Sequence, residues 1–244
     1  MNKGRTLVMA DIHGMNKALV QCLERAGFNK ETDTLIQLGD VADRGPELYE
    51  CVETLLGIPK LISIKGNHDE WFETWLNTGV HPGSSQGGMA SIQSYRKNCE
   101  RIEDPSYAED TNLRIPQSHR TFFKSQRPWY MDEHKNIFVH GGFNRHQYLI
   151  EHKESHVFWW DRDLWHTAMS YEAMSKGLVY HEPGGDNVSQ FRVKEPCKEI
   201  FIGHTPTLLW MKDKPMKAGN VNNLDTGAGA GGKITIMDLE TKEF

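Results

Sequence analysis

The chain has 244 residues, of which 38% are hydrophobic and 25% charged, with a formal net charge of −5 at pH 7. This is the composition of a folded globular protein with enough material for a sizeable core. The negative charge argues against a broad surface for nucleic acids or anionic membranes, and no apolar run approaches the roughly 20 residues of a membrane-spanning helix.

The N-terminal residues and the cysteines point to a protein of the cytoplasm. Residues 1–5 lead directly into a short apolar run, which is not the pattern of a secretory signal. The four cysteines (Cys22, Cys51, Cys99 and Cys197) are far apart and form no CxxC pair, so free thiols in a reducing compartment are expected. With no repeat or low-complexity linker, we expect one domain over 1–244, in the cytoplasm.

Strands and helices alternate over about the first 70 residues. Apolar runs at 6–10, 34–38 and 61–64 predict buried strands. Helical spacing of apolar residues predicts helices over 16–26 and 46–57, each ending near a glycine. These are β-α-β units, so the three strands should be neighbours in a largely parallel arrangement.

The pattern changes between Glu70 and about Lys135. Residues 70–76 and 89–98 are compatible with helices, a polar stretch covers 100–117, and 121–130 is aromatic. We expect a mostly helical insertion over about 71–135 that forms one wall of a cleft. Its aromatic residues could stack on a nucleobase, although they more often form the core of such an insertion. They are Trp71, Phe72, Trp75, Phe122, Phe123, Trp129 and Tyr130.

Further strands are expected at 137–139, 199–202 and 233–237, whereas only 157–165 is informative within 143–197. Five of the strand-like runs end at residues with oxygen or nitrogen donors. In chain order these donors are Asp11 with His13, then Asp40, Asn67 with His68, His140 and His204. Functional side chains gather at the carboxyl ends of strands in α/β folds. The five strand ends therefore predict one shared site, although any one of these residues alone would be better explained by a capped turn or a paired buried group.

The donor types predict a pair of divalent metal ions. Carboxylate, amide and imidazole ligands without cysteine suit Mn²⁺, Fe or Zn²⁺. Asp11 and His13 are two residues apart on an extended segment and can share one ion, while Asp40 has two oxygens and can bridge two. The remaining donors, Asn67, His140 and His204, could complete the second ion. Two ions about 4 Å apart hold a water, lower its pKa and neutralise phosphate oxygens, which suits the hydrolysis of phosphate esters.

These motifs resemble the five sequence blocks of the calcineurin-like metallophosphoesterases. The blocks are Asp11-x-His13-Gly14, Gly39-Asp40-x-x-Asp43-Arg44-Gly45, Gly66-Asn67-His68-Asp69, His140-Gly141-Gly142 and Gly203-His204-Thr205. They occur in family order, and Asp225-Thr226-Gly227 is similar to the family's late DTG segment. Within the family, the chain is most similar to compact bacterial and phage members of the phosphoprotein phosphatase branch.

The resemblance implies an α/β (α+β) fold: a central β-sandwich of two mixed sheets flanked by helices, with two metal ions along one edge. Mn²⁺ is the expected metal, and Fe or Zn²⁺ are alternatives. The implied ligands of the first ion are Asp11, His13 and Asp40, and those of the second are Asp40, Asn67, His140 and His204.

The resemblance also implies catalytic roles. His68 would be the general acid, and Asp43 would orient its imidazole. Arg44 would clamp phosphate oxygens, and Asn67 and His68 would also contact the phosphate. A second arginine is usual in the family. Trp160-Asp161-Arg162-Asp163 is similar to the Trp-x-Arg-acid segment of the short bacterial forms, so we assign Arg162, with an ordinary surface arginine as the alternative.

The motifs give a mixed answer on the substrate. Asp69 stands where protein phosphatases usually have Glu, and both Asp69 and Pro46 resemble the diadenosine tetraphosphatase branch. That branch usually lacks an acid at Asp43, which is present. We expect hydrolysis of phosphoserine or phosphothreonine in proteins and peptides, with phosphotyrosine and small phosphoesters as further substrates. The alternatives are a nucleotide polyphosphate hydrolase and a non-catalytic phosphate-sensing protein; neither nucleic acid nor membrane is an expected partner.

Two other patterns are better explained without a function. The segment 227–233 fits most of a P-loop, but Ile234 replaces the Ser or Thr and a strand is expected to follow, so a turn beside the site is the preferred interpretation. His152 and His156 have helical metal-ligand spacing but lack the His-Glu-x-x-His arrangement, and a solvated face is the simpler explanation.

Overall fold

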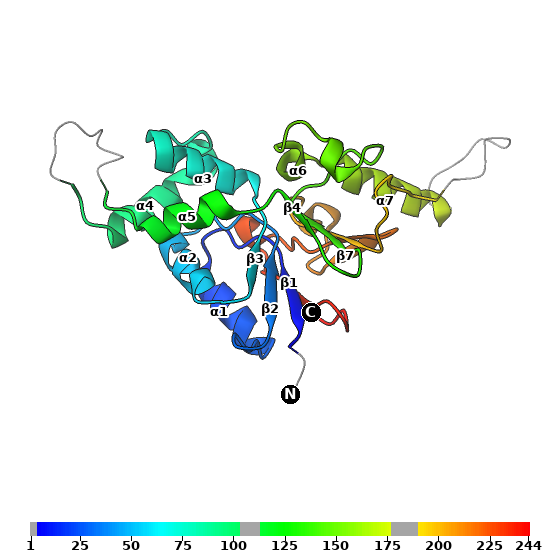
Figure 1. Cartoon of the computed structure of the whole chain (residues 1–244), viewed down its shortest axis with the longest axis horizontal. Helices are drawn as coiled ribbons and strands as arrows, with labels where there is room; N and C mark the ends of the chain where they lie inside the picture. Colours follow the sequence, from blue (N-terminus) through cyan, green and yellow to red (C-terminus); the bar gives the residue numbers. More distant parts are fainter. Residues whose placement is uncertain (1–3, 103–112, 177–189) are drawn as a thin grey trace.

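Two β-sheets occupy the middle of the molecule, with α1–α5 on one side and α6 and α7 on the other (Figure 1). The computed structural model describes residues 4–102, 113–176 and 190–244. The first sheet has the order β3-β2-β1-β9 and the second the order β4-β5-β6-β8-β7. The strands of the first sheet are β1 (Thr6–Met9), β2 (Thr34–Gln37), β3 (Leu61–Ser63) and β9 (Ile236–Asp238). Those of the second are β4 (Trp129–Met131), β5 (Ile137–Val139), β6 (Ile200–Ile202), β7 (Met216–Ala218) and β8 (Val221–Asn223).

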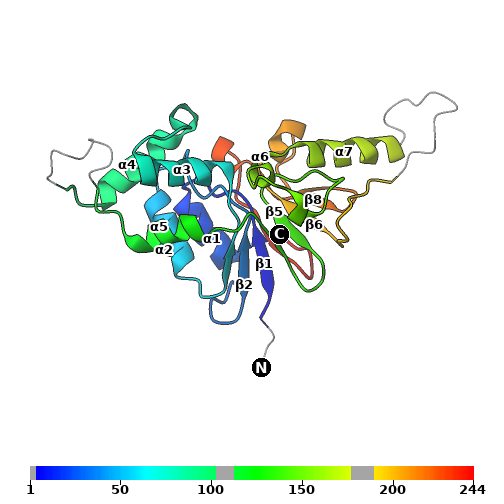
Figure 2. The ribbon, with the colours of Figure 1, turned by 45° about the horizontal axis from the view of Figure 1, so that its top comes forward.

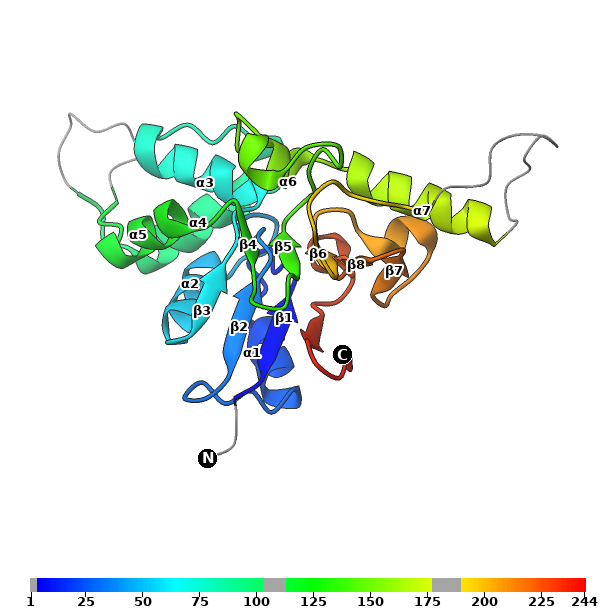
Figure 3. The ribbon, with the colours of Figure 1, turned by 45° about the vertical axis from the view of Figure 1, so that its right-hand side comes forward.

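Both sheets are mixed. In the first, β1, β2 and β3 pair in parallel, as the β-α-β pattern predicted, and β9 adds an antiparallel edge. In the second, β5, β6 and β8 are parallel, and β4 and β7 are antiparallel edges. Figure 3 shows the two sheets beside each other in the centre of the molecule. The expected sandwich of two mixed sheets flanked by helices is confirmed.

The side chains of each central strand alternate between two apolar layers. On β1, Leu7 and Met9 face the cluster shared with α1 and α2, whereas Val8 faces a cluster that also contains Phe138 and Phe201 of the second sheet. The Phe138 and Phe201 rings are stacked, with centroids 5.2 Å apart. The layer between the sheets therefore fixes their relative position, and with it the strand ends that carry the site.

The helices form one group on each side of the sheets (Figure 2). The first group is α1 (Asn16–Arg25), α2 (Leu48–Leu56), α3 (Asn67–Thr78), α4 (Gly88–Asn98) and α5 (Gln117–Ser125); the second is α6 (Val157–Trp160) and α7 (Asp163–Ser175). Short 3₁₀ turns complete the list: η1 (Ser84–Gln86), η2 (Leu149–Glu151), η3 (Thr207–Trp210) and η4 (Ala228–Ala230). No helix in these described ranges is long and apolar enough to cross a membrane.

The segment expected to be a helical insertion is mainly helical, with two corrections. First, α3 begins at Asn67, before the stretch 70–76 that was expected to be helical, so Asn67 and His68 lie on its first turn. Second, Trp129–Met131 is a strand that pairs antiparallel with β5, so the insertion returns to the second sheet before residue 135. Part of the polar stretch, 103–112, and part of the uninformative region, 177–189, lie outside the described residues.

Candidate active site

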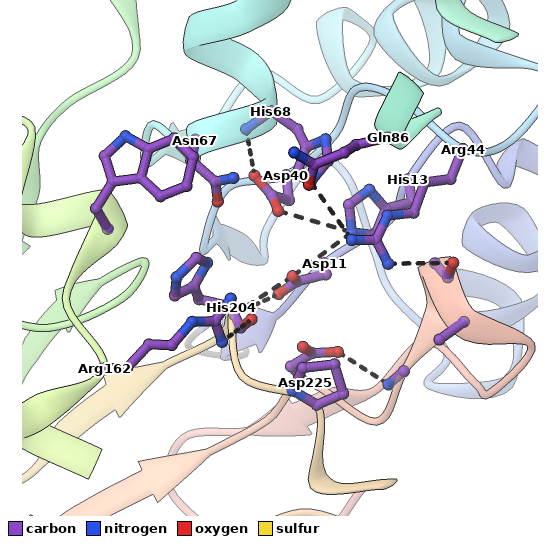
Figure 4. Close-up of a pocket in the computed structure, with 15 residues that line it drawn as sticks. Asp11, His13, Asp40, Arg44, Asn67, His68, Gln86, Arg162, His204 and Asp225 are labelled. Atoms are coloured by element: carbon purple, nitrogen blue, oxygen red, sulfur yellow. Dashed lines mark hydrogen bonds and ion pairs between the residues drawn. The ribbon is translucent and has the colours of Figure 1, made fainter. Parts of the chain in front are cut away.

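A pocket lies where the carboxyl ends of strands from both sheets meet (Figure 4). The structure brings five of the six candidate metal ligands into its lining, together with His68, Arg44 and Arg162. The sixth, His140, lies just beneath, with its Nε2 3.4 Å from Asp40 Oδ1 and 3.2 Å from Asn67 Oδ1. The full lining is Asp11, His13, Asp40, Arg44, Asn67, His68, Gln86, Trp160, Arg162, His204, Pro206, Asp225, Gly227, Gly229 and Ala230.

Unusual backbone conformations bring the ligand-bearing turns together. His13, Asp40, Asp43, Arg44 and His204 all have positive φ, between 50° and 70°. Residues other than glycine rarely adopt this region, and each such residue costs on the order of 1 kcal/mol or more. The first two turns are joined directly, because the backbone N–H groups of Ile12 and His13 both donate to the carbonyl of Asp40. The fold therefore holds these turns in shapes that the sequence would not adopt locally.

Backbone carbonyls set which nitrogen each of two histidines presents to the pocket. His13 Nδ1 lies 2.9 Å from the Ala42 carbonyl and His140 Nδ1 lies 2.8 Å from the Leu38 carbonyl, so both rings donate from Nδ1. Their Nε2 atoms face the Asp40 carboxylate, at 3.6 and 3.4 Å, which leaves Nε2 as the ring atom available to a metal ion. Metal-binding histidines are typically held in this way, with the other ring nitrogen hydrogen-bonded.

The acidic residues of the pocket are crowded. Burial and the neighbouring Asp225 raise the pKa of Asp11 well above its ordinary value. Burial also raises the pKa of Asp225 to about 6. At Asp40, burial alone would raise the pKa, but His140 and His68 outweigh it and hold the pKa well below its ordinary range. The carboxylates thus repel one another, and a cation between them would relieve that repulsion.

An unpaired nitrogen of one buried histidine also indicates metal binding. His204 Nε2 is buried and has no hydrogen-bond partner among the described residues. Burial, His140 and Arg162 lower the pKa of His204 to about 2, so its nitrogen is a free acceptor. Two groups of donor atoms lie within 4.8 Å of one another: His13, Asp40 and His68 in one, and Asp40, His140 and His204 in the other. Oxygen and imidazole donors in two neighbouring groups, with Asp40 common to both, fit the donor preferences of a pair of divalent cations.

His68 and Asp43 form a buried pair at the edge of the pocket. The imidazole Nδ1–H donates to Asp43 Oδ2 at 2.8 Å, which turns Nε2 toward the pocket. Burial would raise the pKa of Asp43, but hydrogen bonds from His68 and His81 outweigh it and lower that pKa. The carboxylate is therefore ionised and holds the His68 ring in one orientation.

The two arginines approach the pocket from different elements, Arg44 from the turn after β2 and Arg162 from the start of α7. Arg44 Nη1 donates to the Gly229 carbonyl at 3.3 Å, and Nη2 lies 3.5 Å from His68 Nε2. Arg162 Nη1 donates to the His204 carbonyl at 3.0 Å and to Thr205 Oγ1 at 2.8 Å. Arg162, which the sequence analysis assigned as the second arginine with an ordinary surface residue as the alternative, lines the same pocket as Arg44.

The structure adds residues for which the sequence offered no role. Asp225 follows β8 and lines the pocket, with its Oδ1 accepting the Gly227 N–H at 2.8 Å. Its similarity to the DTG segment was the available signal. Gln86, from η1, also lines the pocket, and no pattern in the sequence pointed to it.

Asp69 is absent from the pocket lining. Its carboxylate accepts hydrogen bonds from the backbone N–H groups of Val41, Ala42 and Gly66 and from Gln126 Nε2, at 2.9–3.0 Å. It therefore ties the turn after β2 to the start of α3. Whether this position is Asp or Glu concerns the packing of those turns, so it is a weaker guide to substrate than the sequence suggested.

Two other patterns were singled out in the sequence, the glycine-rich segment 227–233 and the histidines His152 and His156. The glycine-rich segment is a turn beside the site, as expected: its Gly229 lies against Arg44 and His13 so closely that a Cβ would come within 2.3 Å of the His13 ring. His152 instead donates to backbone carbonyls of η2, and His156 is exposed and pairs with Glu154.

Most of the aromatic residues of the insertion belong to its core or to β4, but Trp71 differs. Its ring centroid lies 4.9 Å from that of His68 and 5.2 Å from that of Trp160, which lines the pocket. Trp159 and Trp160 both donate from Nε1 to Glu70 Oε2. An aromatic wall thus links α3 to α6 beside the pocket.

Comparisons with known proteins agree with this geometry. Residues 4–208 match the family model described as calcineurin-like phosphoesterase. The chain is similar to serine/threonine-protein phosphatase 1 of Salmonella typhimurium, with 24% identity over 96% of this chain and 91% of that protein. It is also similar to the asymmetrical bis(5'-nucleosyl)-tetraphosphatase PrpE of Anoxybacillus flavithermus, with 23% identity and the same coverage.

A solved structure is similar along nearly the whole chain. It belongs to a protein provisionally named a diadenosine tetraphosphatase, and it matches with a TM-score of 0.63 at 17% identity, covering 99% of this chain and 92% of the other. At that identity the match supports the fold alone.

Proposed function

The chain belongs to the calcineurin-like phosphoesterases, and from this premise we propose that it is a metal-dependent phosphomonoesterase acting on phosphoserine and phosphothreonine, with phosphotyrosine as a further substrate. Members of this family use a dinuclear divalent metal site. In this chain we propose Mn²⁺ as the metal, with Fe or Zn²⁺ as alternatives, because the donors are carboxylate, amide and imidazole.

We propose two metal positions that share Asp40. Asp11 and His13 would hold the first ion with Asp40, and the second would lie among Asp40, Asn67, His140 and His204. When bound, such a pair supplies charge neutralisation for phosphate oxygens and an activated water. Asp225 stands next to Asp11 and would keep that side of the pocket negative enough to retain the cations.

The remaining residues act on the phosphate ester itself. Arg44 and Arg162 would bind the phosphoryl oxygens from two sides, as planar guanidinium donors do. His68, held through Nδ1 by Asp43, would donate the proton on Nε2 to the leaving oxygen. Trp71 packs against the His68 ring and would keep bulk water from it.

The observation that supports the choice of substrate is the number of positively charged side chains in the pocket. Among the described residues that line it, the cationic side chains are Arg44 and Arg162. Two guanidinium groups beside a metal pair suit a single phosphoryl group. A chain of four phosphates would call for further cations to neutralise it. The similarity to a protein named serine/threonine-protein phosphatase 1 supports the same choice.

The alternative is hydrolysis of dinucleoside polyphosphates. It is supported by the similarity to PrpE and by the aromatic wall of Trp71 and Trp160, which could stack an adenine. A non-catalytic phosphate sensor is the weakest reading, because candidates for the metal ligands, the acid and both arginines are all present in one pocket.

The test is metal analysis followed by a turnover panel. The metal-loaded protein is assayed with phosphoserine and phosphothreonine peptides, diadenosine tetraphosphate and an aryl phosphate, and kcat/KM is compared. We expect the phosphopeptides to exceed the dinucleotide. A strong preference for the dinucleotide that is lost in Trp71→Ala would assign the chain to the nucleotide hydrolases, and no turnover of any substrate would favour the sensor.

A further inference from the structure

The loop between α3 and α4 closes over the Asp43–Arg44 turn. The backbone N–H of Arg44 donates to the Gly87 carbonyl at 3.0 Å. Ser91 Oγ accepts the backbone N–H of Asp43 at 2.8 Å and donates to Asp43 Oδ1 at 2.8 Å. His81 Nε2 lies 3.1 Å from the same carboxylate oxygen. The loop therefore reaches both the phosphate-binding arginine and the partner of His68.

The Asp43 carboxylate receives donors on both oxygens. His68 Nδ1–H occupies Oδ2, while His81 and Ser91 occupy Oδ1. The Asp43 side chain is 0% exposed. A buried carboxylate held on both sides cannot rotate, so the orientation of the His68 ring depends on the donors to Oδ1 as well as on its own bond.

The His81 side chain is buried and closely packed beside Asp43. Its side chain is 1% exposed. The ring lies against Gly88, where a Cβ would come within 2.4 Å of it, so the glycine makes room for the imidazole. Its Nδ1 is buried and has no hydrogen-bond partner among the described residues. A buried polar atom without a partner is unfavourable and calls for an explanation.

An apolar ring would fill the same space without leaving Nδ1 unpaired. What the imidazole adds is its single hydrogen bond, the one from Nε2 to Asp43. Since His81 lies two hydrogen bonds from the pocket and is absent from its lining, it cannot contact the substrate itself.

Given the proposed function, on which this inference rests, we propose that His81 is a positioning residue for the general acid. By holding Oδ1 of Asp43, it keeps Oδ2 on His68 Nδ1 and so keeps His68 Nε2 directed at the leaving oxygen. The competing explanation is that His81 merely supports the fold of the loop.

Three variants separate these explanations. His81→Phe keeps a ring and removes the donor, His81→Gln restores a donor without the ring, and His119→Phe is the matched control. His119 is another fully buried histidine, and it bonds to Tyr95 and Glu53 away from the pocket. Each variant is loaded with Mn²⁺ and assayed on a phosphoserine peptide and on an aryl phosphate, and its thermal unfolding is recorded.

We expect His81→Phe to lower kcat on the phosphoserine peptide by roughly 10–100-fold, by analogy with the loss of an outer-shell residue that orients a metal-bound histidine. KM should stay the same, and the aryl phosphate, whose leaving oxygen needs little protonation, should lose less than about threefold. His81→Gln should recover most of the peptide activity, and His119→Phe should leave both substrates unchanged.

The proton resonance of the His68 Nδ1–H group gives a readout independent of turnover. It is recorded on the Zn²⁺-loaded protein, because paramagnetic Mn²⁺ would broaden a nearby proton signal. It should be observed far downfield in the wild type and in His81→Gln, and should broaden or move upfield in His81→Phe. Equal losses on both substrates, or an unchanged resonance in His81→Phe, would overturn the proposal. If His81→Phe does not fold, His81→Leu replaces it in the same comparison with His81→Gln.

A wild type that turns over neither substrate would count against the proposed function. The resonance would then still decide whether His81 holds the Asp43–His68 pair.

Discussion

Two polar clusters around buried histidines differ in how completely their atoms are paired. In the helical layer, Tyr95 OH donates to His119 Nδ1 at 2.7 Å and His119 Nε2 donates to Glu53 Oε1 at 2.6 Å, so both ring nitrogens have partners. At the strand ends, three carboxylates crowd together and His204 Nε2 has no partner among the described residues. Both clusters are built from histidine and acid, yet one is complete and the other is not.

This difference in pairing distinguishes a cluster that stabilises the fold from a cluster that can bind a ligand. A fully paired network stabilises the packing of α2, α4 and α5 and offers nothing to a ligand. The unpaired acceptors and mutually repelling carboxylates of the pocket are unfavourable unless a cation joins them. Removing a residue from the first cluster should therefore weaken the fold without loss of function, and removing one from the second should abolish function while the protein still folds.

The largest expected effect comes from Asp40→Asn. Asp40 is the donor common to both proposed metal positions, so the variant should bind at most one ion tightly and lose roughly 10³-fold or more in turnover. Metal content by mass spectrometry of the native protein and kcat on a phosphopeptide are the measurements. Its far-UV circular dichroism should match the wild type. An Asp40→Asn protein that keeps two ions and normal turnover would show that the pocket is not the metal site.

His68→Asn should slow hydrolysis of an alkyl phosphate by roughly 10²–10⁴-fold, the usual contribution of a positioned acid. An aryl phosphate should lose much less, because its leaving oxygen needs little protonation. The two substrates are compared under single-turnover conditions, so that product release does not mask the chemical step. If both losses are the same, His68 positions the phosphate or a metal and does not donate a proton.

The metal-free protein should lose stability between about pH 6.5 and pH 9. Burial lowers the pKa of His140, but the Asp40 carboxylate outweighs it and raises that pKa to about 9. A raised folded-state pKa contributes stability that is complete below the unfolded value of about 6.5 and is lost as the pH rises through the folded value. The expected loss is on the order of 3 kcal/mol, because each unit of pKa difference corresponds to about 1.4 kcal/mol.

Denaturant unfolding at several pH values, with chelator present, measures this loss. His140→Gln should remove the slope, whereas His119→Phe should retain it. A flat profile for the metal-free wild type between pH 6.5 and pH 9 would contradict the expected charge pairing in the pocket.

The smallest expected effect on turnover is that of His119→Phe. It leaves the buried Tyr95 hydroxyl without an acceptor and should lower the free energy of unfolding by about 1–3 kcal/mol. Turnover and the stabilisation gained on adding Mn²⁺ should stay at wild-type values. A loss of metal binding in this variant would mean that the two clusters are coupled, and the distinction between them would fail.

The strand ends were predictable because each carries two independent signals. A buried β-rich run followed by Gly, Asp, Asn or His can be recognised without knowledge of the fold, and five such runs occur. Asp225 was not predicted as a site residue in this way, although it also follows a strand. Its strand, β8, contains Asn222 and Asn223, which are buried because they donate hydrogen bonds to neighbouring loops. A polar strand satisfied by tertiary contacts has no apolar signature.

Other features that the sequence did not predict have similar physical causes. The helix α7 buries mainly Leu164, Trp165 and Ala168, a narrow stripe that gives weak periodicity. The strand β4 lies in an aromatic segment of the insertion that was expected to be mostly helical, and its pairing with β5 is decided at long range. His81 lies in a loop of glycine, proline and serine, and only the folded chain shows that the loop closes on Asp43.

The positive φ angles at the pocket bear on how this enzyme could be engineered. Of the eight non-glycine residues with positive φ in the described ranges, four (His13, Asp40, Arg44 and His204) line the pocket and a fifth, Asp43, pairs with His68. Glycine would relax the backbone at these positions. A search for thermostable variants that scores melting temperature alone would therefore be drawn to them and would return robust proteins without activity. Selection should instead require turnover at every round, with stabilising changes sought in the helical layer.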